Sequence, residues 1–163
     1  MKRKFAIPFV AAICAACSSP MPDTPATRAE TVKKVLEKVE TTPEGTSTAT
    51  TFEAYKQELA RRISEVNSTN IYLERPQALL RSVIVIKYSV DRNGKLMHSE
   101  IVRSNRDKTT EATALSTLKK TAPFPMPAPH LLHNGRVEIS ETWLFNNDGR
   151  FQLRTIARPQ MSE

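Results

Sequence analysis

The residues with the clearest potential for chemistry are His130 and His133, which a helix would place on one face. Such a pair could begin a metal site, but no cysteine, aspartate or glutamate flanks it in the immediate stretch. We therefore expect a solvated loop here, with no metal and no cofactor. The sequence also contains no glycine-rich phosphate loop, no Gly-x-Ser-x-Gly motif and no carboxylate pair in a catalytic context. No catalytic residue is assigned, so we expect a protein that is not an enzyme; an enzyme of an unrecognised class is the weaker alternative.

Cys17 is the other candidate for chemistry, and it follows a segment typical of a secretory signal. Residues 1–16 begin with Met-Lys-Arg-Lys, continue in an apolar stretch too short to span a bilayer and end in small residues. The sequence Cys14-Ala15-Ala16-Cys17 resembles a bacterial lipobox, which implies that residues 1–16 are removed and that Cys17 is lipidated. No disulfide could then form, because Cys14 leaves with the signal. An ordinary signal peptide with incidental cysteines is the alternative.

The same resemblance to bacterial lipoproteins implies a compartment. Lipoproteins that stay in the inner membrane typically have aspartate after the lipidated cysteine, and this chain has Ser18 at that position. We therefore expect a lipid-anchored, periplasm-facing protein of the cell envelope, on the outer membrane rather than the inner one.

Composition limits the remaining classes. The chain has 163 residues, of which 39% are hydrophobic and 25% charged, which excludes a polytopic membrane protein and a wholly disordered chain. The formal net charge is +7, but three of the 24 basic residues lie in the signal segment. The remaining 21 basic and 17 acidic residues give a net charge of +4. This modest balance does not indicate binding to nucleic acid.

The pattern along the chain divides it into a tether and one domain. Residues 17–51, rich in Ser, Thr, Pro and Ala, are expected to form the lipidated N-terminus and a flexible tether. An apolar stripe within them predicts a short helix over 28–40, too short to be stable unless it docks. Residues 52–159 are expected to form the folded domain, and residues 160–163 a disordered tail.

From Phe52 the hydrophobic pattern predicts two helices and four strands. Apolar residues at spacings of three and four predict helices, whereas alternating apolar and polar residues predict strands. Asn93-Gly94 predicts a tight hairpin turn. The expected elements are a helix over 52–66, strands over 81–90 and 95–104, a helix over 109–121, and strands over 136–145 and 150–156. They indicate an α+β fold in which a small antiparallel sheet of three to four strands packs under two helices, in the order α-β-β-α-β-β.

Three stretches of this sequence resemble the TonB C-terminal domain family, over about residues 55–159. They are Val83-x-Val85-x₄-Val90-Asp91-x-x-Gly94-x-Leu96, the helix from Ala112 running into Ala122-Pro123-Phe124-Pro125-x-Pro127, and Glu141-Thr142-Trp143-Leu144-Phe145 followed by Asp148–Leu153. The resemblance implies a periplasmic interaction module linked to energy transduction or transport. Such a domain holds an extended segment of its partner by strand addition at a sheet edge.

The resemblance also implies where the partner binds. The edge of the strand over 136–145 would receive the partner segment, through alternate residues of that strand: Arg136, Glu138, Ser140, Thr142 and Leu144. The expected partners are outer-membrane or other envelope proteins, with a homodimer as an open alternative. The strand over 150–156 could occupy the same edge, either as a permanent fourth strand or as a strand that a partner displaces.

Two departures from TonB leave a second function open. Residues 5–16 contain no histidine and are too short to span a bilayer, and residues 18–51 lack the proline-rich dipeptide rod of TonB. Coupling to the proton-gradient motor is therefore left undecided. The alternative is a lipoprotein that resembles TolA in serving envelope integrity, with no coupling to that motor.

Overall fold

The computed structural model describes residues 24–35 and 45–160. The expected signal segment and the predicted lipid site at Cys17, with Ser18, lie outside these residues, as do residues 36–40 of the predicted tether helix. Among the described residues, no helix is long and apolar enough to cross a membrane.

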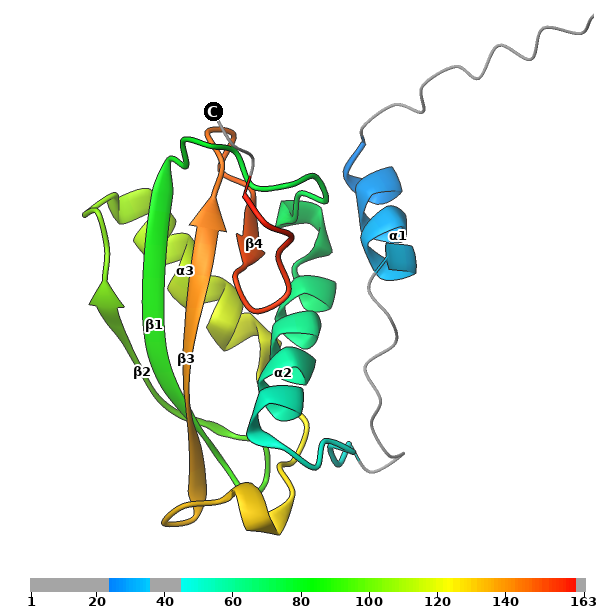
Figure 1. Cartoon of the computed structure of the whole chain (residues 1–163), viewed down its shortest axis with the longest axis vertical. Coiled ribbons are helices and arrows are strands. Elements are labelled where there is room, and N and C mark those ends of the chain that lie inside the picture. The colour runs from blue at the N-terminus through cyan, green and yellow to red at the C-terminus, as the bar shows by residue number, and fades with distance from the viewer. Residues whose placement is uncertain (1–23, 36–44, 161–163) are drawn as a thin grey trace, which may run out of the picture.

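Four antiparallel strands form one sheet in the order β2-β1-β3-β4. The strands are β1 (Ser82–Asp91), β2 (Leu96–Arg103), β3 (Arg136–Phe145) and β4 (Phe151–Leu153). Two helices, α2 (Phe52–Val66) and α3 (Lys108–Thr121), cover one face of the sheet (Figure 1). The predicted α+β class is thus confirmed, with a four-stranded sheet and a third helix, α1 (Pro25–Val35), before the domain.

The core forms where the strands' apolar positions meet the helices. Alternate residues of β1 and β3 are buried because successive side chains of a strand point to opposite faces. These side chains pack with the apolar stripe of α2, which gives one core cluster. The β1 and β3 members are Ile84, Ile86, Tyr88, Val90, Val137, Ile139, Trp143 and Phe145. Glu141 is the polar exception among the core-facing residues of β3, and it is 3% exposed.

Short-range signals set the ends of several elements. Thr51 caps α2 by accepting the N–H of Ala54, and Asp107 caps α3 by accepting the N–H groups of Thr109 and Thr110. In the turn between β1 and β2, Gly94 has a φ of +76°, a conformation that favours glycine. The predicted hairpin therefore forms at Asn93-Gly94, and β3 has the predicted bounds.

The segment before α2, which the sequence assigned to the flexible tether, lies on the domain. Ser47 donates its backbone N–H to Met126 O at 2.9 Å, and Met126 N–H bonds to Gly45 O at 2.9 Å. The Ser47 hydroxyl donates to the buried carboxylate of Glu58. Residues 45–51 are therefore tied to the domain by backbone hydrogen bonds, which a hydrophobic pattern does not reveal.

Helix α1 packs beside α2 rather than standing free (Figure 1). Val32 is fully buried in the core cluster, and Arg28 Nη1 donates to Thr69 O at 2.9 Å. The helix begins before the predicted residue 28, and its last described residue is Val35.

Strand β4 is shorter than predicted, with three residues in place of the expected 150–156. After Leu153 the backbone turns, because Ile156 N–H and Ala157 N–H both bond to Leu153 O, at 3.1 and 2.9 Å. The prediction of a longer strand was wrong, and β4 covers only the end of β3, from Trp143 to Phe145.

Candidate functional site

The predicted edge residues of β3 do present their backbone groups on the side away from β1. Arg154 N–H bonds to Thr142 O at 2.9 Å, and Leu144 lies opposite Gln152 of β4. Because backbone groups of an antiparallel strand alternate between its two neighbours, Glu138 and Ser140 point to this same side.

The edge is only partly occupied. Leu144 and Thr142 contact β4 and the turn after it, and Arg136 exchanges backbone hydrogen bonds with His133, at 2.8 and 3.2 Å. Within residues 24–35 and 45–160, Glu138 and Ser140 have no strand partner on this side, and their side chains are exposed. The structure thus places the predicted residues along one edge but leaves only its middle open.

A buried carboxylate marks the boundary between the occupied and open parts. Glu141 Oε1 accepts the N–H of Thr142 at 2.7 Å and that of Thr155 at 3.4 Å. Glu141 Oε2 has no hydrogen-bond partner among the described residues. Burial raises the pKa of the Glu141 carboxyl, and hydrogen bonds from Thr155 and Thr142 offset this only in part. The carboxylate takes the N–H that a neighbouring strand would otherwise bond.

The sequence did not single out Glu141. The one available signal was an acidic residue at a core-facing position of β3, between Ile139 and Trp143. Such a residue indicates a buried charge that needs local partners.

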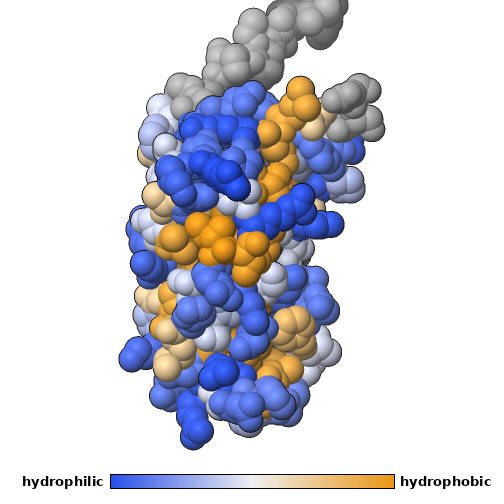
Figure 2. Space-filling view, turned by 90° about the vertical axis from the view of Figure 1, so that its left-hand side faces the viewer, coloured by the Kyte–Doolittle hydropathy of each residue, from blue (hydrophilic) through white to orange (hydrophobic). Residues whose placement is uncertain are grey.

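The other edge of the sheet, β2, is less suited to pairing. Its register with β1 shifts between Val85 and Ile86 and again between Ser89 and Val90, so two irregularities bend this strand. Met97 and Val102 of β2 are 57% and 53% exposed, and the side that carries β2 shows apolar groups separated by hydrophilic ones (Figure 2). Irregularities of this kind protect an exposed edge against unwanted pairing, which leaves β3 as the regular edge.

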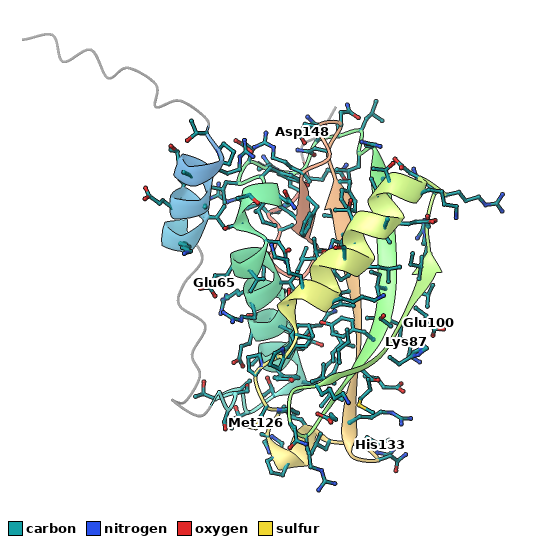
Figure 3. The ribbon with its side chains drawn as sticks, turned by 180° about the vertical axis from the view of Figure 1, so that it is seen from behind. Glu65, Lys87, Glu100, Met126, His133 and Asp148 are labelled. Atoms are coloured by element: carbon teal, nitrogen blue, oxygen red, sulfur yellow. The ribbon has the colours of Figure 1, made fainter. Side chains whose placement is uncertain are left out.

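The open face of the sheet beside β3 is charged. A shallow hollow of about 350 Å³ crosses it, lined by side chains of β1, β2 and β3 that include His98. Glu138 lies 3.3 Å from Lys87 Nζ and 3.6 Å from Arg136 Nε. Lys87 also lies opposite Glu100 of β2, and the two are seen together in Figure 3. A strand added at β3 would therefore meet paired charges on this face.

The two histidines singled out by spacing have other roles in the structure. His130 Nε2 lies 2.8 Å from Thr50 O and so contacts the segment before α2. The backbone of His133 pairs with Arg136. No group of three or more potential metal ligands occurs in the part of the chain that the structure describes.

Comparison with known proteins gives no match for this chain among family models, curated proteins or solved structures.

Proposed function

We propose that this protein is a cell-envelope lipoprotein, anchored through Cys17, whose domain binds an extended segment of an outer-membrane or other envelope protein. The segment adds to the edge of β3 at Glu138 and Ser140. The observation that carries the proposal is the open stretch of this edge, between the Arg136–His133 pair and the Glu141 carboxylate. The resemblance to the TonB C-terminal domain family supports a role of this contact in energy transduction or transport.

The length of the open edge indicates a weak and reversible contact. Glu138 and Ser140 offer two N–H donors and two C=O acceptors, each contributing about 0.5–1.5 kcal/mol net. Together these four backbone hydrogen bonds contribute about 2–6 kcal/mol to binding. A binding free energy of about 4 kcal/mol corresponds to a Kd of about 1 mM, so over most of this range the backbone bonds alone give millimolar or weaker binding. Side-chain contacts, or release of Thr142 for a longer ladder, are needed for tighter binding.

A photo-crosslinking residue in place of Ser140 tests the proposal in intact cells. Ser99 of β2 is the matched control, because it is also a serine whose backbone groups face away from β1, on the opposite edge. We expect crosslinks to an extended segment of an envelope protein from position 140 and few from position 99. Equal crosslinking from both positions, or crosslinks from 140 only to a second copy of the chain, would contradict a heterologous partner.

Proline substitution tests the role of the backbone directly, because proline removes the N–H. Ser140→Pro should abolish the crosslink formed by a photo-reactive residue at position 138, whereas Ser99→Pro should preserve it. Circular dichroism of both variants must show the same folded content, so that loss of the crosslink reports the edge and not unfolding.

The anchor has a separate test. Mass spectrometry of the native N-terminus should find lipid on Cys17, and Cys17→Ala should release the protein into the periplasm. Retention of residues 1–16, or an unchanged membrane fraction for Cys17→Ala, would refute the lipid anchor. Neither result would bear on the proposal that a partner binds at the edge of β3.

A further inference from the structure

An exposed leucine stands at the end of the molecule where α1 begins. Leu79 is 74% exposed, more than any other large apolar side chain among the described residues. Residues 159–160, near the end of the chain, hold the loop that carries Leu79. Gln160 Nε2 donates to Gln77 O at 2.6 Å and to Ala78 O at 2.7 Å. Arg75 Nε donates to Pro159 O at 2.9 Å. The loop is held in place, and Leu79 still points to solvent.

Arginines lie beside this loop on the neighbouring segment. The loop between β2 and α3 is tied to it, because Asn105 Nδ2 donates to Arg81 O at 2.9 Å and Arg81 Nε lies 2.8 Å from Asp107 Oδ2. Arg103, the last residue of β2, and Arg106 of this second loop are exposed. Neither has a carboxylate partner among the residues that the structure describes. This end of the molecule therefore presents one apolar side chain beside two arginines that have no carboxylate partner among the described residues.

The docked helix α1 keeps the same end near the lipid anchor. Val32 and Arg28 hold α1 on the domain, and α1 starts at the end that carries these loops (Figure 1). Residues 17–24 would span at most about 28 Å when fully extended, at about 3.5 Å per residue. With α1 docked, a lipid on Cys17 thus limits how far this end can move from the bilayer.

We propose that this surface, formed by Arg75, Leu79, Arg103 and Arg106 and called here the basic end, rests on an anionic phospholipid bilayer. The inference rests on the Cys17 anchor of the proposed function. Arginines near an anionic surface are attracted to its headgroups, and an exposed leucine can enter the interface between headgroups and acyl chains.

This orientation would direct the open edge of β3 away from the membrane. The open stretch lies toward the His133 end of β3, whereas Asp148 lies at the end shared with α1 (Figure 3). The edge at Glu138 and Ser140 would then face the periplasm, where an extended segment of an envelope protein could reach it without crossing the membrane surface.

Vesicle flotation of the mature chain carrying Cys17→Ser tests the basic end without the lipid. We expect binding to vesicles of phosphatidylcholine mixed with phosphatidylglycerol, and little binding to phosphatidylcholine alone. The double variant Arg103→Ser/Arg106→Ser should lower the affinity about thirtyfold, and Leu79→Ser about tenfold. The matched controls are Lys119→Ser/Lys120→Ser at the C-terminal end of α3, and Met97→Ser on β2.

A fluorescent label gives a second readout. The mature chain carrying Cys17→Ser contains neither Cys14 nor Cys17, so adding Leu79→Cys gives it a single thiol for an environment-sensitive dye. Its emission should shift to shorter wavelength with anionic vesicles, and that of Met97→Cys should not. Absence of binding by the unlipidated protein, or equal losses in the controls, would overturn the proposal. If the Cys17→Ser protein binds anionic vesicles but mass spectrometry finds no lipid on native Cys17, the anchor is refuted and the membrane contact of the basic end is still supported.

Discussion

The carboxylate of Glu141 accepts the backbone N–H of the next residue, Thr142, with 2.7 Å between oxygen and nitrogen. This N–H lies on the side of β3 that faces β4, where a carbonyl of the neighbouring strand would otherwise bond it. Arg154 N–H does bond to Thr142 O, so only half of the expected pair forms at this position. Glu141 therefore ends the β3–β4 ladder, and it does so with a charge that is almost fully buried.

The first prediction concerns pH. Burial raises the pKa of Glu141 above its ordinary value of 4.5, so the folded state holds this proton more tightly than the unfolded state. The contribution of Glu141 to the free energy of unfolding should then fall as the pH rises from about 4.5 through the raised folded pKa. Glu141→Gln removes the titration but keeps an oxygen for Thr142 N–H.

Urea denaturation of both proteins at several pH values checks this. Relative to Glu141→Gln, the natural chain should lose stability as the pH is raised toward neutral. Other carboxylates titrate in both proteins and cancel in the comparison. A difference that does not change with pH would show that the buried carboxyl titrates at its ordinary pKa.

The second prediction compares two glycines with positive φ. A Cβ on Gly94 would lie 1.9 Å from Phe124 O, whereas a Cβ on Gly149 would lie 3.9 Å from its nearest neighbour among the described residues, Arg81 Nη1. Gly149→Ala should lower the free energy of unfolding by about 1 kcal/mol, because alanine is strained in the left-handed backbone conformation. Gly94→Ala should cost more than about 3 kcal/mol, because a backbone carbonyl must also move. Thermal unfolding followed by circular dichroism measures both, and equal losses would contradict the close contact.

Local signals were sufficient for most of the fold. The bounds of β3 and α2 followed from alternation and from helical spacing, because each depends on residues close in sequence. The same alternation identified the residues along the edge of β3, whereas the prediction that a partner binds there came from the resemblance.

What the sequence missed depends on distant partners. Residues 45–51 dock through backbone bonds to Met126, and polar Thr and Ser side chains give no pattern for such contacts. The role of Glu141 depends on Thr155 reaching it after a turn. The length of β4 depends on that same turn, although the break in alternation between Leu153 and Ile156 was a signal.

The third prediction concerns α1. An isolated helix of this length is marginal in water, so its order depends on docking through Val32. Val32→Asp should release α1 and leave residues 45–160 folded. Amide hydrogen exchange should become fast in α1 alone, and trypsin should cleave at Lys33. Glu30→Ala, on the exposed side of α1, is the control and should change neither readout. Equal exchange in Val32→Asp and the natural chain would show that α1 is ordered without this contact.

The last prediction decides whether β4 can be displaced. Phe151 and Leu153 are fully buried, and the ring of Phe151 lies 5.6 Å from that of Phe145. Removing two such side chains from the core costs about 2–5 kcal/mol each, against a total stability of about 5–15 kcal/mol for a domain of this size. This favours a permanent fourth strand over one that yields to a partner.

Two truncations test this. A chain that ends at Asn147 lacks β4 and should be largely unfolded by circular dichroism. A chain that ends at Leu153 keeps β4 but lacks the Arg154 N–H and Thr155 N–H that close the edge, so it should fold and crosslink more strongly to its partner from position 140. The segment that controls the length of the open edge is then the turn after β4. A folded chain ending at Asn147 with strengthened crosslinking would instead identify β4 itself as the displaceable strand.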